Sequence, residues 1–169
     1  MTAPTSEVGD GAEARMMTRL RAIILGAAAG GGLPKGHCGC ANCEADRQGE
    51  IPRATQSSLA VTANGHDWAI LNASPDIGEQ LVATPALHPT GLRKSPLKAV
   101  LLTNADLDHV AGLLTLREKQ PFQLFATSDI LGVIAANPVF GAPDPAWVTG
   151  TAVALEAPFE LRPGLQARL

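Results

Sequence analysis

LKAVLLTNADLDHVAGLL, residues 97–114, is the stretch from which the expected fold of this chain is most readily inferred. Its first part, 97–104, is a short apolar run that predicts a buried β-strand. The segment 106–119 then has apolar residues at helical spacing and predicts an α-helix. Polar side chains lie where the strand gives way to the helix, and side chains at this end of a strand converge on a crevice in α/β sheets. The same stretch therefore predicts both an element of the fold and a candidate site.

Strands and helices alternate on both sides of this stretch, and the alternation predicts an α/β fold. Asn64-Gly65 separates two β-rich segments and predicts a hairpin turn, because both residues tolerate positive φ. Ser74 and Ser128 precede apolar segments with helical spacing and are the expected N-caps of two helices. The further strands are expected at 20–26, 57–63, 66–73 and 122–127, and the further helices at 74–85 and 128–138.

The composition predicts one globular domain with a hydrophobic core. The 169 residues are 46% apolar, and a domain of this length can bury such a core. The net charge of −3 comes without a basic run, which argues against a nucleic-acid or anionic-membrane surface. No stretch approaches the roughly 20 apolar residues of a membrane span. Residues 1–17 lack periodicity and are expected to form a disordered leader before a folded domain at 18–169.

All three cysteines of the chain, Cys38, Cys40 and Cys43, lie close together. Thiolates are strong zinc ligands, and this spacing can direct three sulfurs at one ion about 2.3 Å away. A fourth ligand would come from elsewhere, and His37 and Asp46 are near in the sequence. Such a closed site is structural rather than catalytic. The alternative is that small, soft residues pack in a turn. Clustered thiols with no disulfide framework also indicate a reducing compartment, the cytoplasm.

A second candidate site follows the strand predicted at 97–104. Asn104, Asp106, Asp108 and His109 come directly after it, on the turn and on the first helical residues. Helix capping is the alternative, in which one aspartate satisfies the free amides at the start of the helix. Capping accounts for one aspartate but leaves the other aspartate and His109 without a role.

Two further stretches carry weaker signals. The glycine-rich loop at 26–36 follows a strand but lacks the G-x-G-x-x-G and G-K-[ST] spacings of nucleotide sites. A turn packed closely against the sheet is the favoured interpretation. In LNASPD, residues 71–76, the Asp76 carboxylate could orient a metal ligand through a hydrogen bond. A carboxylate in the first turn of a helix explains Asp76 equally well.

Six stretches of the chain carry a resemblance to a known family. They are GAAAGGG, HCGCANC, TQSSLAV, NASPD, LLTNADLDHVAGLL and LREKQPFQLFAT. From about Leu20 to Val148, the chain resembles the metallo-β-lactamase superfamily and, more closely, its branch in pyrroloquinoline quinone (PQQ) biosynthesis. The resemblance implies an αββα four-layer sandwich of two β/α halves, of which this chain is expected to hold the first, incomplete at the C-terminus. An isolated half would expose a sheet face, so a homodimer is one expectation.

The resemblance also implies roles for the polar residues after the strand. The H-x-H-x-D-H metal motif of the superfamily falls on Asn104, Asp106, Asp108 and His109, so its first two histidines are replaced. Asp108 and His109 are therefore the expected catalytic metal ligands, with Asp106 as a further ligand. The residues expected to support these ligands without binding the metal are Asn104, Ser74 and Asp76.

An Asp-His pair with one further histidine would resemble the ligand set of non-haem iron. The resemblance accordingly implies iron(II)-dependent hydroxylation of the tyrosine ring in the crosslinked Glu-Tyr intermediate of PQQ synthesis, beside a structural zinc at the cysteines. The four histidines stand at positions 37, 66, 88 and 109, so none follows His109 to complete the centre. The expected partners are a small-molecule or dipeptide PQQ precursor and other PQQ biosynthesis proteins.

Two alternatives stay open at this point. One is a non-enzymatic carrier that binds PQQ or its precursor as an accessory of transport. The other is a metal-dependent phosphodiesterase, because a phosphonate-pathway phosphodiesterase of the superfamily is similar in the Cys-x-Cys-x-x-Cys loop. The replaced histidines argue against hydrolysis, since they would hold one zinc of a hydrolytic pair.

Overall fold

A six-stranded sheet forms the centre of the chain, and its strand order follows the sequence from β1 to β6. The computed structural model describes residues 19–141 and 144–169, so the leader expected at 1–17 lies outside the described residues. Strands β1 to β3 pair antiparallel, and β3 to β6 pair parallel. The strands are β1 (Arg21–Gly26), β2 (Ser58–Thr62), β3 (Trp68–Leu71), β4 (Leu97–Leu101), β5 (Phe122–Ala126) and β6 (Val148–Ala152), with a separate hairpin of β7 (Phe159–Arg162) and β8 (Leu165–Ala167).

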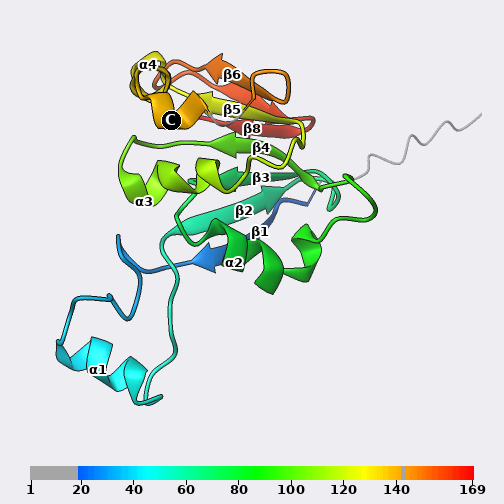
Figure 1. Cartoon of the computed structure of the whole chain (residues 1–169). Helices are drawn as coiled ribbons and strands as arrows, with labels where there is room; N and C mark the ends of the chain where they lie inside the picture. The colour runs from blue at the N-terminus through cyan, green and yellow to red at the C-terminus, as the bar shows by residue number, and fades with distance from the viewer. Residues whose placement is uncertain (1–18, 142–143) are drawn as a thin grey trace, which may run out of the picture.

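Helices cover one face of the sheet, and the β7–β8 hairpin packs on the other (Figure 1). Helix α1 (Ala41–Arg47) stands apart from the sheet at the end of two extended connections. The predicted α/β class is confirmed by this alternation of strands and helices. No helix in the described ranges is long and apolar enough to cross a membrane. The helices on the sheet are α2 (Ile77–Ala83), α3 (Leu107–Val110) and α4 (Ser128–Ala136), and the 3₁₀ turns are η1 (Pro85–Leu87), η2 (Ala111–Leu114) and η3 (Pro138–Gly141).

The central strands are buried on both faces, which explains their continuously apolar sequences. On the helix-covered face, Trp68 and Val100 are fully buried in the larger core. On the opposite face, Phe125 and Leu161 belong to a second core that joins the sheet to the β7–β8 hairpin. The rings of Phe125 and Phe159 stack there with their centroids 5.7 Å apart. Successive side chains of a strand thus point to opposite faces of the sheet and pack in two different cores.

The hairpin predicted at Asn64-Gly65 is present between β2 and β3. Of these two residues, only Gly65 has a positive φ, 78°. Asn64 instead closes the loop through its side chain, because its Oδ1 accepts hydrogen bonds from the backbone N–H groups of His66 at 2.9 Å and Asp67 at 2.8 Å. This side-chain closure is a common role of asparagine in turns, and it makes the loop wider than a two-residue turn.

The N-cap predicted at Ser74 is wrong, because α2 begins only at Ile77. Ser74 is fully buried, and its hydroxyl donates to Gln80 Oε1 at 3.3 Å. The hydroxyl is therefore engaged inside the fold and cannot cap the helix. Asp76 occupies the cap position without a side-chain cap hydrogen bond.

The N-cap predicted at Ser128 is also wrong by one residue. Thr127 caps α4, and its Oγ1 accepts a hydrogen bond from the Ile130 backbone N–H at 3.4 Å. Ser128 is the first helical residue instead. Threonine and serine can both accept a hydrogen bond from a free amide at a helix start. The sequence alone therefore does not show which of the two neighbouring residues, Thr127 or Ser128, is the N-cap.

The helix predicted at 106–119 is shorter than expected. Helix α3 ends at Val110 and continues only as the 3₁₀ turn η2. Gly112 lies directly against the loop that follows β3, where its N–H donates to the Ala73 carbonyl oxygen at 2.9 Å. A Cβ on Gly112 would overlap the Ser74 carbonyl oxygen. The Gly112 N–H is thus bonded to Ala73 and is not available for the hydrogen bond that it would make within a continuing α-helix.

We expect Gly112→Ala to lower the free energy of unfolding by about 3 kcal/mol, because the added Cβ forces two backbone segments apart. Urea denaturation measures this change. The matched control is Gly132→Ala, within α4, where a Cβ meets no other heavy atom within 4 Å. That variant should be more stable by up to about 1 kcal/mol, from helix propensity alone. Equal stabilities of the two variants would contradict the close contact at Gly112.

Candidate metal sites

The three cysteines form the one group of at least three metal-binding side chains among the described residues. Their sulfurs all lie within 4.8 Å of one another. Cys38 and Cys40 lie in the turn before α1, and Cys43 is on the helix with 2% of its surface exposed. The Lys35 backbone N–H donates to the Cys43 sulfur at 3.4 Å. Three thiolates so placed can meet at one zinc ion with bonds of about 2.3 Å.

The cysteines lie in a projecting segment between Leu33 and Ala54, the cysteine arm, which carries α1 (Figure 1). At its base, Leu33 and Ala54 exchange backbone hydrogen bonds of 2.8 and 3.0 Å. Helix α1 has seven residues, of which only Cys43 is buried. A helix this short is not stable alone in water, so the arm depends on the cluster for a core. Neither His37 nor Asp46 joins the described cysteine group as a fourth ligand.

Hydrogen bonding and burial give Cys40 and Cys43 different pKa values. The pKa of Cys40 is lowered to about 7, chiefly by the Cys43 backbone N–H and then by the thiols of Cys38 and Cys43. The pKa of Cys43 is raised: the Lys35 N–H lowers it, but burial and the neighbouring thiols outweigh that effect. Cys40 therefore ionises at a lower pH than Cys43 and offers a thiolate to a metal near neutral pH.

In metal-free protein, we expect iodoacetamide to alkylate Cys40 with a rate that is half-maximal near pH 7. The thiolate is the nucleophile, so the rate falls about tenfold for each pH unit below that point. Mass spectrometry of the Cys40 peptide measures the rate. A midpoint near the ordinary value of 9.0 would contradict the lowered pKa of Cys40. Added zinc should protect the same thiol.

Asp108 and His109 lie in α3, beyond the carboxyl end of β4. His109 Nε2 is 3.9 Å from Asp108 Oδ2, and the two side chains are 18% and 26% exposed. They present one nitrogen and one carboxylate oxygen side by side in a half-buried position. These are donors that suit a divalent transition metal.

Thr103 and Asn72 orient the His109 ring from the opposite side. The Thr103 hydroxyl donates to Asn72 Oδ1 at 3.0 Å, and the Thr103 N–H donates to the same oxygen at 2.9 Å. Thr103 Oγ1 also lies 3.5 Å from His109 Nδ1. Because the Thr103 hydroxyl proton is directed at Asn72, Thr103 Oγ1 can only accept a hydrogen bond from His109 Nδ1. The arrangement favours the tautomer with Nδ1–H and leaves Nε2 available to a metal.

Sequence reasoning missed Asn72 and Thr103 as site residues. Asn72 has a φ of 63° and stands just after β3, inside the strand predicted at 66–73. Asparagine is among the few residues that adopt this backbone conformation readily. An asparagine late in an apolar run was thus the available signal. Its partner lies 31 residues away, and no local pattern indicates that contact.

The glycine-rich loop packs beside Asp108, in agreement with the turn predicted there. A Cβ on Gly30 would lie 3.2 Å from Asp108 Oδ2, so a side chain would crowd this carboxylate. The next residue, Gly31, donates its N–H to Gln56 Oε1 at 2.8 Å. Asp76 Oδ2 accepts from Gln56 N at 2.8 Å and Gln56 Nε2 at 3.1 Å. Asp76 therefore holds Gln56, and Gln56 in turn holds the loop.

The other predicted site residues lie apart from the metal-binding pair or serve the backbone. Asn104 Oδ1 accepts from the Asp106 N–H at 3.0 Å, which shapes the turn before α3. Asp106 is exposed and, within the described residues, forms no three-ligand group with Asp108 and His109. Ser74 is in the buried contact with Gln80 and touches neither side chain of the pair in its described hydrogen bonds.

Residues 67–169 match the family model of the β-lactamase superfamily domain. The chain belongs to the β-lactamase superfamily. Within the superfamily it is similar to coenzyme PQQ synthesis protein B of Ruegeria pomeroyi, with 53% identity over 150 residues that cover 89% of this chain and 51% of that protein. It is also 55% identical over 153 residues to the protein of the same name from Methylobacterium sp. strain 4-46, again covering 89% and 51%. The chain thus spans about half the length of these curated relatives.

Two solved structures match the fold described above. The Zn²⁺-bound PqqB from Methylobacterium extorquens superposes with a TM-score of 0.85 at 50% identity, covering 87% of this chain and 54% of that one. A diphosphatase from the PhnP family superposes with a TM-score of 0.66 at 22% identity, covering 85% and 54%, and supports the fold alone. The metallo-β-lactamase fold and the resemblance to the PQQ branch are both confirmed.

Proposed function

We propose that the chain serves in PQQ biosynthesis, as part of an iron-dependent hydroxylase that acts on the tyrosine ring of a crosslinked Glu-Tyr intermediate. The observation that carries the proposal is the 50% identity and TM-score of 0.85 to a Zn²⁺-bound PqqB. The half-buried pair of Asp108 and His109 lies within residues 67–169, which match the family model of the β-lactamase superfamily domain. The partners proposed are the precursor, other PQQ biosynthesis proteins and a second copy of the chain, in the cytoplasm.

The two donor sets suit different metals. Three sulfurs within 4.8 Å fit zinc, which would cross-link the cysteine arm. One imidazole nitrogen and one carboxylate oxygen fit two of the three positions in the ligand set of non-haem iron. Ferrous iron held by Asp108 and His109 would supply oxygen activation at the carboxyl end of β4. The described residues bring no second histidine to this pair.

The neighbours of the pair have positioning roles in this proposal. Thr103 accepts from His109 Nδ1 and fixes the ring, and Asn72 holds Thr103 through two hydrogen bonds. Gly30 leaves room for the Asp108 carboxylate. In the overall reaction, a ring C–H becomes C–OH with one oxygen atom of O₂. The other oxygen atom becomes water, with two electrons from an added reductant of the ascorbate class and two protons.

The direct test is to incubate the iron-loaded chain with the crosslinked Glu-Tyr compound, oxygen and ascorbate. Mass spectrometry should detect one added oxygen atom, and ¹⁸O₂ should supply it. The His109→Ala variant should give no product while it keeps zinc in the cysteine arm. Tight binding of PQQ or its precursor that survives His109→Ala, without oxygen consumption, would favour a carrier instead. Hydrolysis of bis-p-nitrophenyl phosphate would point to a phosphodiesterase.

A separate prediction tests the role of Thr103. Thr103→Val keeps the shape of the side chain but removes the hydroxyl between Asn72 and His109. We expect ferrous-ion affinity to fall roughly 10- to 100-fold, the usual cost of losing a partner of a metal-binding histidine. Thr103→Ser keeps the hydroxyl and should remain near wild type. Equal affinities of the two variants, measured by anaerobic titration calorimetry, would exclude the positioning role.

A further inference from the structure

A basic cavity of about 470 Å³ lies at the amino ends of β3 and β4. Arg93, Lys94 and Lys98 line it, and none of them has a carboxylate within 4.0 Å among the described ion pairs. The carboxylate that lines the cavity, Asp67, is paired with Arg162 at 3.6 Å. The cavity therefore holds three cations whose charge is not matched by a neighbouring side chain. In a protein of net charge −3, this local excess of positive charge favours an anion.

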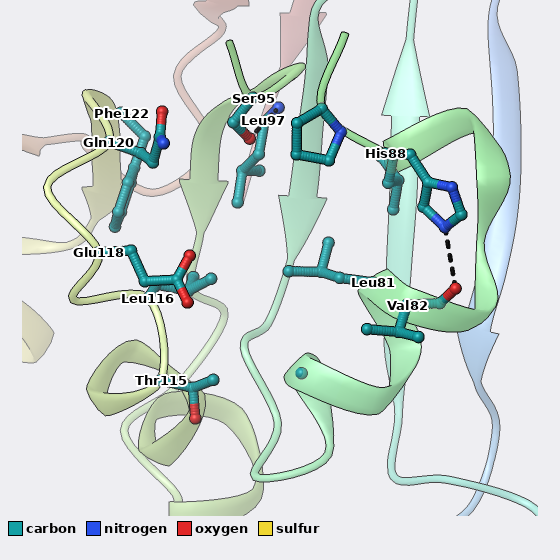
Figure 2. Close-up of a pocket in the computed structure, with 13 residues that line it drawn as sticks. Leu81, Val82, His88, Ser95, Leu97, Thr115, Leu116, Glu118, Gln120 and Phe122 are labelled. Atoms are coloured by element: carbon teal, nitrogen blue, oxygen red, sulfur yellow. Dashed lines mark hydrogen bonds between the residues drawn. The ribbon is translucent and has the colours of Figure 1, made fainter. Parts of the chain in front are cut away.

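An apolar cavity of about 410 Å³ lies beside it, between α2 and residues 115–122 (Figure 2). Leu81, Leu97, Leu116 and Phe122 supply much of its lining. This volume and this predominantly apolar lining are typical of a small-molecule site.

The two cavities adjoin, because His88 and Ser95 line both of them. The His88 ring is fixed at this border, where its Nε2 donates to the Val82 carbonyl oxygen at 2.9 Å. Figure 2 draws His88 and Ser95 toward the upper side of the apolar cavity and Glu118 across from His88, next to Leu116. The carboxylate of Glu118 therefore lies across the cavity from His88, which lines the border with the basic cavity. The basic cavity is thus cationic, and the neighbouring cavity is lined mainly by apolar side chains, with the Glu118 carboxylate on the side opposite His88.

This combined space is separate from the metal-binding pair. Lys98 stands at the start of β4, and His109 follows the end of the same strand. The four steps from Leu97 to Leu101 make β4 about 13 Å long at roughly 3.3 Å per residue. Neither Asp108 nor His109 lines either cavity. A ligand in the cavities therefore needs no contact with Asp108 or His109.

We propose that the adjoining cavities form a binding site for an anionic amphiphile. An oxyanion head, carboxylate or phosphate, would lie among Arg93, Lys94 and Lys98, and an apolar body would enter the cavity between α2 and residues 115–122. The site stands on charge complementarity and shape, and it does not depend on the proposed hydroxylase function.

Decanoate, kept below its aggregation concentration, is the first probe, and the chain is observed by ¹H–¹⁵N NMR. Decanoate should bind saturably and shift the amide signals of His88, Ser95 and Leu97. Decylamine, which has the opposite charge, and acetate, which lacks the apolar body, should each bind at least about tenfold more weakly. Decyl phosphate distinguishes the two heads, because the tighter of decanoate and decyl phosphate identifies the preferred oxyanion.

Two variants and one matched control localise the binding. Lys94→Glu reverses an exposed cation of the basic cavity, and Val82→Glu places a charge at the apolar cavity on a side chain that is 78% exposed. Each should weaken decanoate at least about tenfold without lowering the unfolding midpoint. Lys119→Glu changes an exposed lysine that lines neither cavity and should leave decanoate binding unchanged. Equal binding of decylamine, or unchanged affinity in Lys94→Glu, would overturn the proposal.

Discussion

Replacing Cys40 by serine should reduce the zinc affinity of the chain more than about 100-fold and release the cysteine arm from its ordered state. Changing a residue that only supports a metal ligand already costs roughly 10- to 100-fold, and Cys40 is proposed as a direct ligand. Zinc binding and folding are coupled in such sites, so the seven-residue helix α1 should lose its order with the metal. Zinc content, limited proteolysis between Leu33 and Ala54 and the unfolding midpoint measure the three consequences.

The exposure of Cys40 makes this variant informative. A serine at an exposed position changes stability by only about 0.5 kcal/mol when no special contact is lost. In chelator-treated protein, Cys40→Ser and wild type should therefore unfold at the same temperature. The matched control Ala41→Ser alters the neighbouring exposed residue and should keep zinc and protease resistance. Unchanged zinc content in Cys40→Ser would contradict the zinc site and favour the alternative, in which the cysteines are small residues packed in a turn.

The double variant Asp108→Asn/His109→Ala should lose ferrous-ion binding by more than about 100-fold while the cysteine arm keeps its zinc. The variant removes the imidazole nitrogen and the carboxylate charge of the half-buried pair, whereas the arm lies elsewhere on the chain (Figure 1). Anaerobic titration with ferrous iron, followed by metal analysis, separates the two sites.

Asp106→Asn is the matched control for that experiment. Asp106 is exposed and joins no three-ligand group in the described part of the chain. Its replacement should change ferrous-ion affinity less than about threefold, the scale of a surface charge change. A loss in Asp106→Asn as large as in the double variant would restore Asp106 as a ligand, as the family motif implies. Loss of zinc in the double variant would contradict the separation of the sites.

Much of the fold could be predicted because its strands are short apolar runs bounded by turn residues. The runs at 97–104 and 122–127 became β4 and β5, and they are buried on both faces. Helix starts were harder to predict, because a buried hydroxyl and a capping hydroxyl look alike in the sequence. Ser74 donates to Gln80 in the interior, and only the tertiary structure reveals that partner.

The candidate sites also contain one part that was predictable from the sequence and one part that was not. The three cysteines are close in the sequence, so their convergence follows from local geometry and was predictable. The support of His109 depends on Asn72, which lies 31 residues before Thr103 and reaches it only through the pairing of β3 with β4. The hold of Asp76 on Gln56 similarly joins two segments 20 residues apart. Contacts between distant segments of this kind leave no periodic pattern.

The proposed function requires two metal sites of different chemistry, a zinc site in the cysteine arm and an iron site at Asp108 and His109. Metal analysis of the purified chain by inductively coupled plasma mass spectrometry, before and after anaerobic loading with ferrous iron, tests it most directly. We expect about one zinc per chain before and after loading, and iron that is retained by the wild type but lost by the Asp108→Asn/His109→Ala variant. Absence of zinc, or iron that only displaces zinc, would show that the chain does not carry two separate metal sites.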